Sequence, residues 1–208
     1  MTDLLAGAVP PVRHPLLGRR WTVNWHQDSP RPLDTSLLGF AHSTAEQGVN
    51  GTGPFQACRD LLQRRRPRLI RPVDGSRRRA GEPIVEAAVR LTRELDAGVL
   101  PVQGPPGSGK TYTGARMILS LADAGKRIGV TAVSHKVIRN LLLKTHEAAA
   151  DAGTSVTLAH KARPGESPTG AIQQITDNDQ AIAALGDGAV VGGTAWLWAR
   201  EQTVETLD

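Results

Sequence analysis

The eight residues from Gly104 to Thr111 constrain the fold of this chain more than any other stretch, because they read Gly-Pro-Pro-Gly-Ser-Gly-Lys-Thr. The stretch follows an apolar run at 99–102 and precedes a segment with helical periodicity. Its glycines let the backbone approach a ligand closely and adopt angles that other residues avoid. A strand, a glycine-rich loop and a helix in this order are typical of a phosphate-binding loop.

The residue types in the loop suit a nucleoside triphosphate bound with magnesium. Lys110 can reach the β- and γ-phosphates, the Thr111 hydroxyl can ligate Mg²⁺, and the positive end of the following helix adds to the field. We therefore predict Lys110 and Thr111 as catalytic residues and Thr111 as the metal ligand. The predicted nucleotide-binding residues are Gly104, Pro105, Pro106, Gly107, Ser108, Gly109, Lys110, Thr111 and Tyr112. A glycine-rich turn without a ligand is the alternative interpretation.

Composition divides the 208-residue chain near residue 81. The apolar periodic segments lie almost entirely after Glu82, whereas the first eighty residues hold most of the prolines. We predict an irregular extension and linker, rich in Pro, Gly and Arg, over 1–81 and a folded domain over 82–208. No run approaches eighteen apolar residues and the N-terminus does not resemble a signal peptide, so we expect a cytoplasmic protein with no membrane partner. The single cysteine, Cys58, leaves no internal disulfide or cysteine zinc cluster.

Helix and strand signals alternate after Glu82, as a doubly wound parallel sheet requires. The predicted strands are 99–102, 128–132, 156–158 and 189–194. The predicted helices run from Pro83 toward Gly98, from Lys110 toward Gly125, onward from the cap Ser134, and from Ala171 to Leu185, with Val137, Ile138, Leu141 and Leu142 on the buried side of the third.

Arginines concentrated between residues 59 and 79 produce the net charge of +5. They are Arg59, Arg64, Arg65, Arg66, Arg68, Arg71, Arg77, Arg78 and Arg79. Such a run can neutralise nucleic-acid phosphates in a salt-dependent way. A solvated basic linker is equally consistent with it, because no aromatic side chain is interleaved for base stacking.

Three motifs carry a resemblance to a known family. Residues 103–111 resemble the Walker A motif of superfamily 1 helicases, in the branch of the nonsense-mediated-decay helicase, and 100–117 are more specifically similar to bacterial RecB-like nuclease-helicase proteins. Residues 130–136 with Asn140 are similar to helicase motif Ia, and 191–194 to the next motif that contacts single strands. The resemblance covers roughly residues 53–208.

The resemblance implies an α/β fold, an incomplete RecA-like P-loop parallel sheet after a largely irregular extension. It also implies ATP and Mg²⁺ as cofactors, and single-stranded DNA or RNA as the partner of a full-length parent. The expected nucleic-acid contacts are Ser134, His135, Lys136, Asn140 and Thr194. The first four cluster at a helix N-terminus, which itself favours an anion. The alternative is that Ser134 only caps the helix and that its neighbours are merely exposed.

The family pattern also includes an Asp-Glu pair after an apolar strand, a second RecA-like domain and an adenine-reading glutamine. We expect that strand to begin near Asp208, so the chain is expected to be a piece of a helicase core that hydrolyses ATP slowly or not at all. Asp177 and Asp179 are not expected to replace the pair, because 172–176 has a helical pattern. In place of the glutamine, the helix before the loop offers Glu82 and Glu86.

Two functions from different classes remain. The first is ATP binding by a truncated helicase-type P-loop domain whose full-length parent couples ATP hydrolysis to movement on DNA or RNA. The second is a non-catalytic nucleic-acid-binding module that acts through residues 59–79. A small P-loop kinase is a third possibility, disfavoured because no acceptor-site or lid-like arginine pattern follows Ala171.

Overall fold

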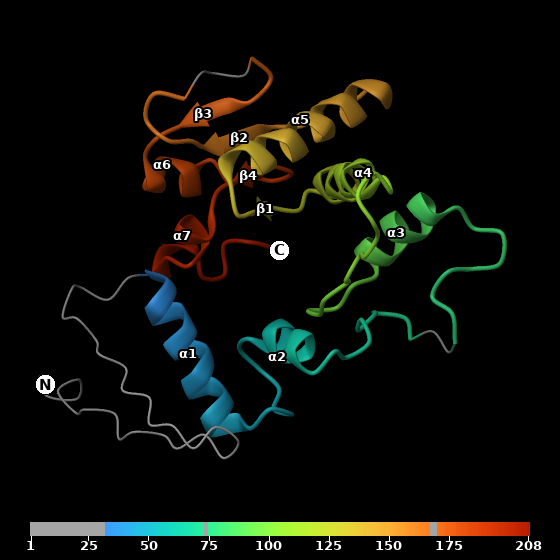
Figure 1. Ribbon diagram of the computed structural model, residues 1–208, viewed down its shortest axis with the longest axis vertical. Helices are drawn as coiled ribbons and strands as arrows, with labels where there is room; N and C mark the ends of the chain where they lie inside the picture. The colour runs from blue at the N-terminus through green and yellow to red at the C-terminus, as the bar shows by residue number, and fades with distance from the viewer. Residues whose placement is uncertain (1–31, 73–74, 167–169) are drawn as a thin grey trace, which may run out of the picture. The chain divides into compact units, whose positions relative to one another are not determined.

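Four short parallel strands form the sheet of this α/β protein (Figure 1). The strands are β1 (Ile128–Val130), β2 (Leu158–Lys161), β3 (Gln173–Ile175) and β4 (Val190–Gly192). Their order is β1-β4-β2-β3, so the last strand in the sequence lies inside the sheet. The structure is a computed structural model that describes residues 32–72, 75–166 and 170–208. Residues 1–31 of the predicted extension lie outside the described residues.

Seven α-helices and one 3₁₀ turn surround or precede the sheet in the described part of the chain. They are α1 (Pro32–Gln47), α2 (Gln56–Leu62), α3 (Ile84–Arg93), α4 (Lys110–Ala122), α5 (His135–Asp151), α6 (Asn178–Ala183), α7 (Ala195–Trp198) and the turn Glu201–Thr203. None of these helices combines the length and apolar character needed to cross a membrane. The sequence predicts irregular chain up to residue 81, yet α1 and α2 are helical, and the unit that contains the sheet begins at Pro32. Helix α1 buries no residue, so its sequence carries no core-facing stripe that could have indicated it.

The two faces of the sheet bury alternate residues of β4. Val190 packs with Ile138 and Leu142 of α5, whereas its neighbour Val191 packs with Ala181 of α6 and Leu197 of α7. This alternation follows from the two-residue period of a strand, and it places helices on both faces. The predicted strand at 189–194 is therefore confirmed in its central part.

Local signals predicted the start of α5 and the end of α4, whereas α3 ends at Arg93, before the end predicted at Gly98. Ser134 caps α5, because its hydroxyl oxygen accepts a hydrogen bond from the Val137 amide at 3.4 Å. Gly125 follows α4 with a φ of +77°, a left-handed conformation that suits the end of a helix. Ile138 and Leu142 are fully buried as predicted, but Val137 is 51% exposed, so its assignment to the buried face was wrong.

The predicted strand at 99–102 does not form, and this segment is irregular between α3 and α4 (Figure 1). Pro101 cannot donate a ladder hydrogen bond, which disfavours pairing on that side. The weak strand predicted at 156–158 lies later, at Leu158–Lys161. The polar side chains of His160 and Lys161 had masked its second half.

The predicted helix over 171–185 is also wrong, because it is replaced by β3 and the short helix α6. Ile172 and Ile175 are three residues apart, a spacing that suits one face of a helix. In the strand the same spacing places them on opposite faces of the sheet, and each face buries one of them. The Asp177 carboxylate then accepts a hydrogen bond from the Gln180 amide at 2.9 Å and starts α6.

The close contact between β4 and α5 predicts a large effect of a single methyl group. A Cβ at Gly192 would lie 2.5 Å from Ile138 Cγ2 and 2.9 Å from Leu142 Cδ1. We expect Gly192→Ala to lower the free energy of unfolding by about 1–3 kcal/mol, measured by urea denaturation. Gly186→Ala is the matched control, because open space surrounds that position, and it should change stability by no more than about 1 kcal/mol. Equal stability of the two variants would contradict the packing described here.

An ion pair links α3 to the segment before it. Arg90 donates hydrogen bonds of 2.8 Å to both carboxylate oxygens of Glu82 and a third, also 2.8 Å, to the carbonyl oxygen of Arg77. The hydrogen bonds from Arg90, together with the Arg79 amide, lower the pKa of Glu82 from 4.5 to about 2. The charged carboxylate therefore stabilises the folded state above pH 4.5, and this contribution is lost as the pH falls through about 2.

We accordingly expect Glu82→Gln to weaken the pH dependence of unfolding. The variant should be less stable than the unsubstituted protein near neutral pH, and its urea midpoint should fall less between pH 4.5 and 2. Glu86→Gln removes an exposed carboxylate from the first turn of α3 and should retain the full pH dependence. If Glu82→Gln behaved like Glu86→Gln, the ion pair would not be formed in solution.

Candidate functional site

The predicted phosphate loop folds around the ammonium group of Lys110. Its Nζ donates hydrogen bonds of 2.7 Å to the carbonyl oxygens of both Gly104 and Pro105. The Ser108 amide also donates to the Pro105 carbonyl oxygen, at 3.3 Å. The loop therefore closes on its own lysine and places a positive charge inside the turn.

Glycine is required at particular positions of this loop. Gly107 and Gly109 have φ angles of +79° and +80°, which L side chains rarely adopt. Gly104 is constrained differently, because a Cβ there would lie 2.5 Å from the Ser108 hydroxyl. Side chains at these three positions would therefore strain the loop backbone or clash with Ser108.

Helix α4 begins directly at the loop. Gly109 is its N-cap and carries no side chain to accept from the first amides, and the Thr113 amide donates to the Gly109 carbonyl oxygen at 2.9 Å. The first amides of an α-helix have no partner inside the helix, so they favour an anion at this end. Residues 107–112 are all exposed, so a ligand can reach them.

A pocket of about 400 Å³ extends from the loop along α4 and α5. Gly107, Gly109, Lys110, Thr111, Tyr112, Arg116, Asn140, Lys144, Glu147, Ala148 and Asp151 line it. The Arg116 guanidinium lies 3.4 Å from the centre of the Tyr112 ring and pairs with Asp151 at 3.4 Å. The ring of Tyr112, a predicted nucleotide contact, is therefore covered on one face by an arginine of its own helix.

The residues present fit a phosphate group, since the glycine-rich loop, the lysine and the helix start converge. The same site offers fewer groups for Mg²⁺ than for a phosphate. Thr111 offers one exposed hydroxyl, and the two carboxylates that line the pocket, Glu147 and Asp151, pair with Lys144 at 2.6 Å and Arg116 at 3.4 Å. Asp177 caps α6 after β3, which is the edge strand farthest from β1 in the sheet order.

The predicted nucleic-acid contacts follow two neighbouring strands. Residues 134–136 come after β1, and Thr194 comes after β4, which pairs with β1. The Gly193 amide donates a hydrogen bond to the Val130 carbonyl oxygen at 2.9 Å, which holds the C-terminal ends of β4 and β1 together. Asn140 instead lines the pocket beside the phosphate loop, and Lys136 is exposed.

His135 does not point freely into solvent. Its Nδ1 lies 3.2 Å from Nε2 of His160, a residue of β2 that is only 4% exposed. Burial lowers the pKa of His160, and the nearby His135 lowers it further. The sequence does not predict a role for His160, because a histidine between Ala159 and Lys161 does not indicate contact with α5.

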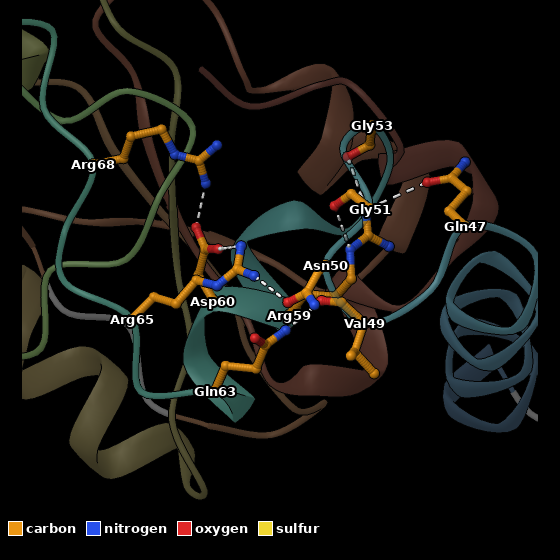
Figure 2. A network of polar contacts seen from close by, with 10 residues as sticks. All are labelled: Gln47, Val49, Asn50, Gly51, Gly53, Arg59, Asp60, Gln63, Arg65 and Arg68. Carbon is orange, nitrogen blue, oxygen red and sulfur yellow. Dashed lines mark hydrogen bonds and ion pairs between the residues drawn. The ribbon is translucent and has the colours of Figure 1, made fainter.

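The basic segment is partly an internal structure. Figure 2 shows Arg59, which is 2% exposed, surrounded by oxygen acceptors. The guanidinium donates to the carbonyl oxygens of Gly51 and Gly53 at 3.2 and 3.4 Å, and to side chains of Ser43 and Gln47 in α1 at 3.3 and 3.5 Å. Arg59 therefore joins α2 to the preceding turn and to α1.

A second internal group surrounds Asp60, whose carboxylate is almost fully buried (Figure 2). It pairs with Arg65 at 3.5 Å and with Arg68. A pocket of about 360 Å³ adjoins this group and is lined by Asp60, Arg65, Arg66, Pro67, Arg68, Leu69, Pro72 and Arg77. Four arginines and one aspartate give the pocket a net positive charge.

Comparison with models of protein families, with curated proteins and with solved structures gives no match for this chain.

Proposed function

We propose that the chain binds ATP with Mg²⁺ through residues 104–111, as the nucleotide-binding part of a superfamily 1 helicase-type P-loop domain. The observation that carries the proposal is the closure of the loop around Lys110 Nζ, with two carbonyl contacts of 2.7 Å. An ammonium group held in this way occupies a position where it can exchange carbonyl oxygens for phosphate oxygens. The motif resemblance supports ATP as the nucleotide.

The chain's own groups define how the phosphates would be held. Glycines at 104, 107 and 109 leave the loop amides accessible, and the start of α4 contributes further amides. Lys110 neutralises charge, and Thr111 offers a hydroxyl to the metal. Bound Mg-ATP would supply the phosphoanhydride bond and the divalent charge.

The proposed nucleic-acid surface is the edge where β1 and β4 end. Ser134, His135, Lys136 and Thr194 follow these paired strands, and the N-terminus of α5 lies at the same edge. Ligands of open α/β sheets bind outside the carboxyl ends of the strands, which supports this placement. In a full-length parent, a single strand of DNA or RNA would lie across this edge while ATP is hydrolysed.

The nucleotide proposal is tested with Lys110→Ala and Mg-ATP in a calorimetric titration. We expect at least a 10-fold loss of affinity, because a hydrogen bond to a charged group contributes about 1.5–3 kcal/mol. Lys126→Ala removes an exposed lysine after the end of α4 and should leave affinity unchanged. Equal affinity of the two variants would remove the loop from the proposed site.

The cationic pocket beside Asp60 favours a second candidate function, a nucleic-acid-binding module that acts through residues 59–79. Its four arginines offer guanidinium donors to phosphate without the P-loop, and two of them, Arg65 and Arg68, also pair with Asp60. Arg64, Arg66, Arg71, Arg78 and Arg79 are exposed, so they remain accessible to a polyanion.

Deleting residues 59–79 would remove the buried Arg59 and Asp60, so exposed arginines give a cleaner test. We expect the combined Arg66→Ala, Arg71→Ala and Arg78→Ala variant to bind a single-stranded oligonucleotide at least about 10-fold more weakly at low salt, if this module is the working part. Lys110→Ala should then bind the oligonucleotide normally. Normal binding by the triple variant would exclude the second candidate.

A further inference from the structure

Three potential metal ligands converge where β1 and β2 approach the start of α5. They are His135, His160 and Glu166, and one ligand atom from each lies within 4.8 Å of the others. His160 comes from β2, His135 is the first residue of α5, and Glu166 lies in the connection from β2 to β3. Residues from three separate segments thus present side-chain donors to one point.

The spacing of the two imidazoles agrees with a shared ion. His135 Nδ1 and His160 Nε2 are 3.2 Å apart. Two nitrogens bound tetrahedrally to zinc at about 2.0–2.1 Å are about 3.3 Å apart, so an ion that replaces the hydrogen bond between the rings would change the separation of these nitrogens little. The rings are tilted by 56°, with centroids 5.2 Å apart, so they do not stack face to face.

The backbone around the three donors is held in place. His160 is 4% exposed and belongs to a strand paired on both sides, with β3 and with β4. The His135 position is fixed by the Ser134 cap of α5. The Gln174 side-chain amide donates to the Glu166 carbonyl oxygen at 2.8 Å, which anchors that part of the connection to β3.

Charges of both signs lie near the cluster. Arg139 and Lys161 place positive charge near His160, and Glu166 supplies the opposing negative charge. Two imidazoles and one carboxylate form a donor set that zinc uses in three-ligand sites with an open fourth position. The cluster contains no thiolate, the ligand that Cu(I) and iron–sulfur clusters require.

We propose that His135, His160 and Glu166 bind one zinc ion, with the fourth position open to water or to an external ligand. The site is independent of the nucleotide loop and does not require the proposed function, although it shares His135 with the proposed nucleic-acid surface. By joining the start of α5, the strand β2 and the β2–β3 connection, the ion would also stabilise the edge where the proposed nucleic-acid surface lies.

The test uses the tag-free full chain, stripped of metal with a chelator and titrated with Co²⁺ as a spectroscopic substitute for zinc. We expect one ion per chain and the intense visible absorption of a tetrahedral cobalt site. His135→Gln and Glu166→Gln should each weaken binding by at least about 100-fold, since even outer partners of a metal site contribute 10–100-fold. Zinc should displace the cobalt and abolish the absorption.

Matched controls come from the same helix. His146→Gln and Glu147→Gln alter exposed residues of α5 and should bind cobalt like the unsubstituted protein. Lys110→Ala should also bind it normally, which separates this site from the nucleotide loop. Because His160 is buried, its substitution can unfold the chain, so the test depends on His135 and Glu166, with circular dichroism to verify folding. Undiminished cobalt binding by both His135→Gln and Glu166→Gln, or no tetrahedral spectrum at saturation, would overturn the proposal.

Discussion

The close approach of α5 to the central strand β4 is the contact on which the rest of the site depends. Gly192 has no side chain, and this lets Ile138 and Leu142 pack directly against the strand. Helix α5 can therefore lie against the sheet with its N-terminus at the carboxyl ends of β1 and β4. Its first turn carries His135 and Lys136 toward the proposed nucleic-acid edge, and its middle turns bring Asn140 and Lys144 to the pocket beside the phosphate loop. One tightly packed helix thus serves both proposed surfaces.

The proposed phosphate loop illustrates how a short sequence can favour its own conformation. Lys110 bonds carbonyl oxygens five and six residues earlier, and the glycines supply the backbone angles that such a tight return requires. These interactions lie within eight residues, so the loop does not need the sheet to adopt its shape. The same locality explains why the positions that need glycine can be read from the amino-acid sequence.

Other parts of the fold depend on contacts between residues that are distant in the sequence. The cap at Ser134 and the end of α4 near Gly125 were predictable, because each rests on bonds within a few residues. Strand β3 was not, since the spacing of Ile172 and Ile175 suits a helix as well, and pairing with β2 decides between the two. The apolar run at 99–102 predicts a strand that does not form, because an apolar run becomes a strand only where it can pair with a partner strand. The cluster of His135, His160 and Glu166 has no recognisable spacing in the sequence, because its three residues come from separate segments that the fold brings together.

That strand order also bears on how the protein folds. β4 lies between β1 and β2, so Ile128 and Leu158 both pair with Val190 rather than with each other. Strand β1 has no ladder partner until the chain as far as Gly192 is available, whereas β2 can already pair with β3. Most of the sheet contacts therefore join residues distant in sequence, a topology that slows folding. During synthesis, α4 and α5 would be complete while the apolar faces that they cover in the native sheet still lacked their central strand, which makes this interval the one most exposed to misfolding.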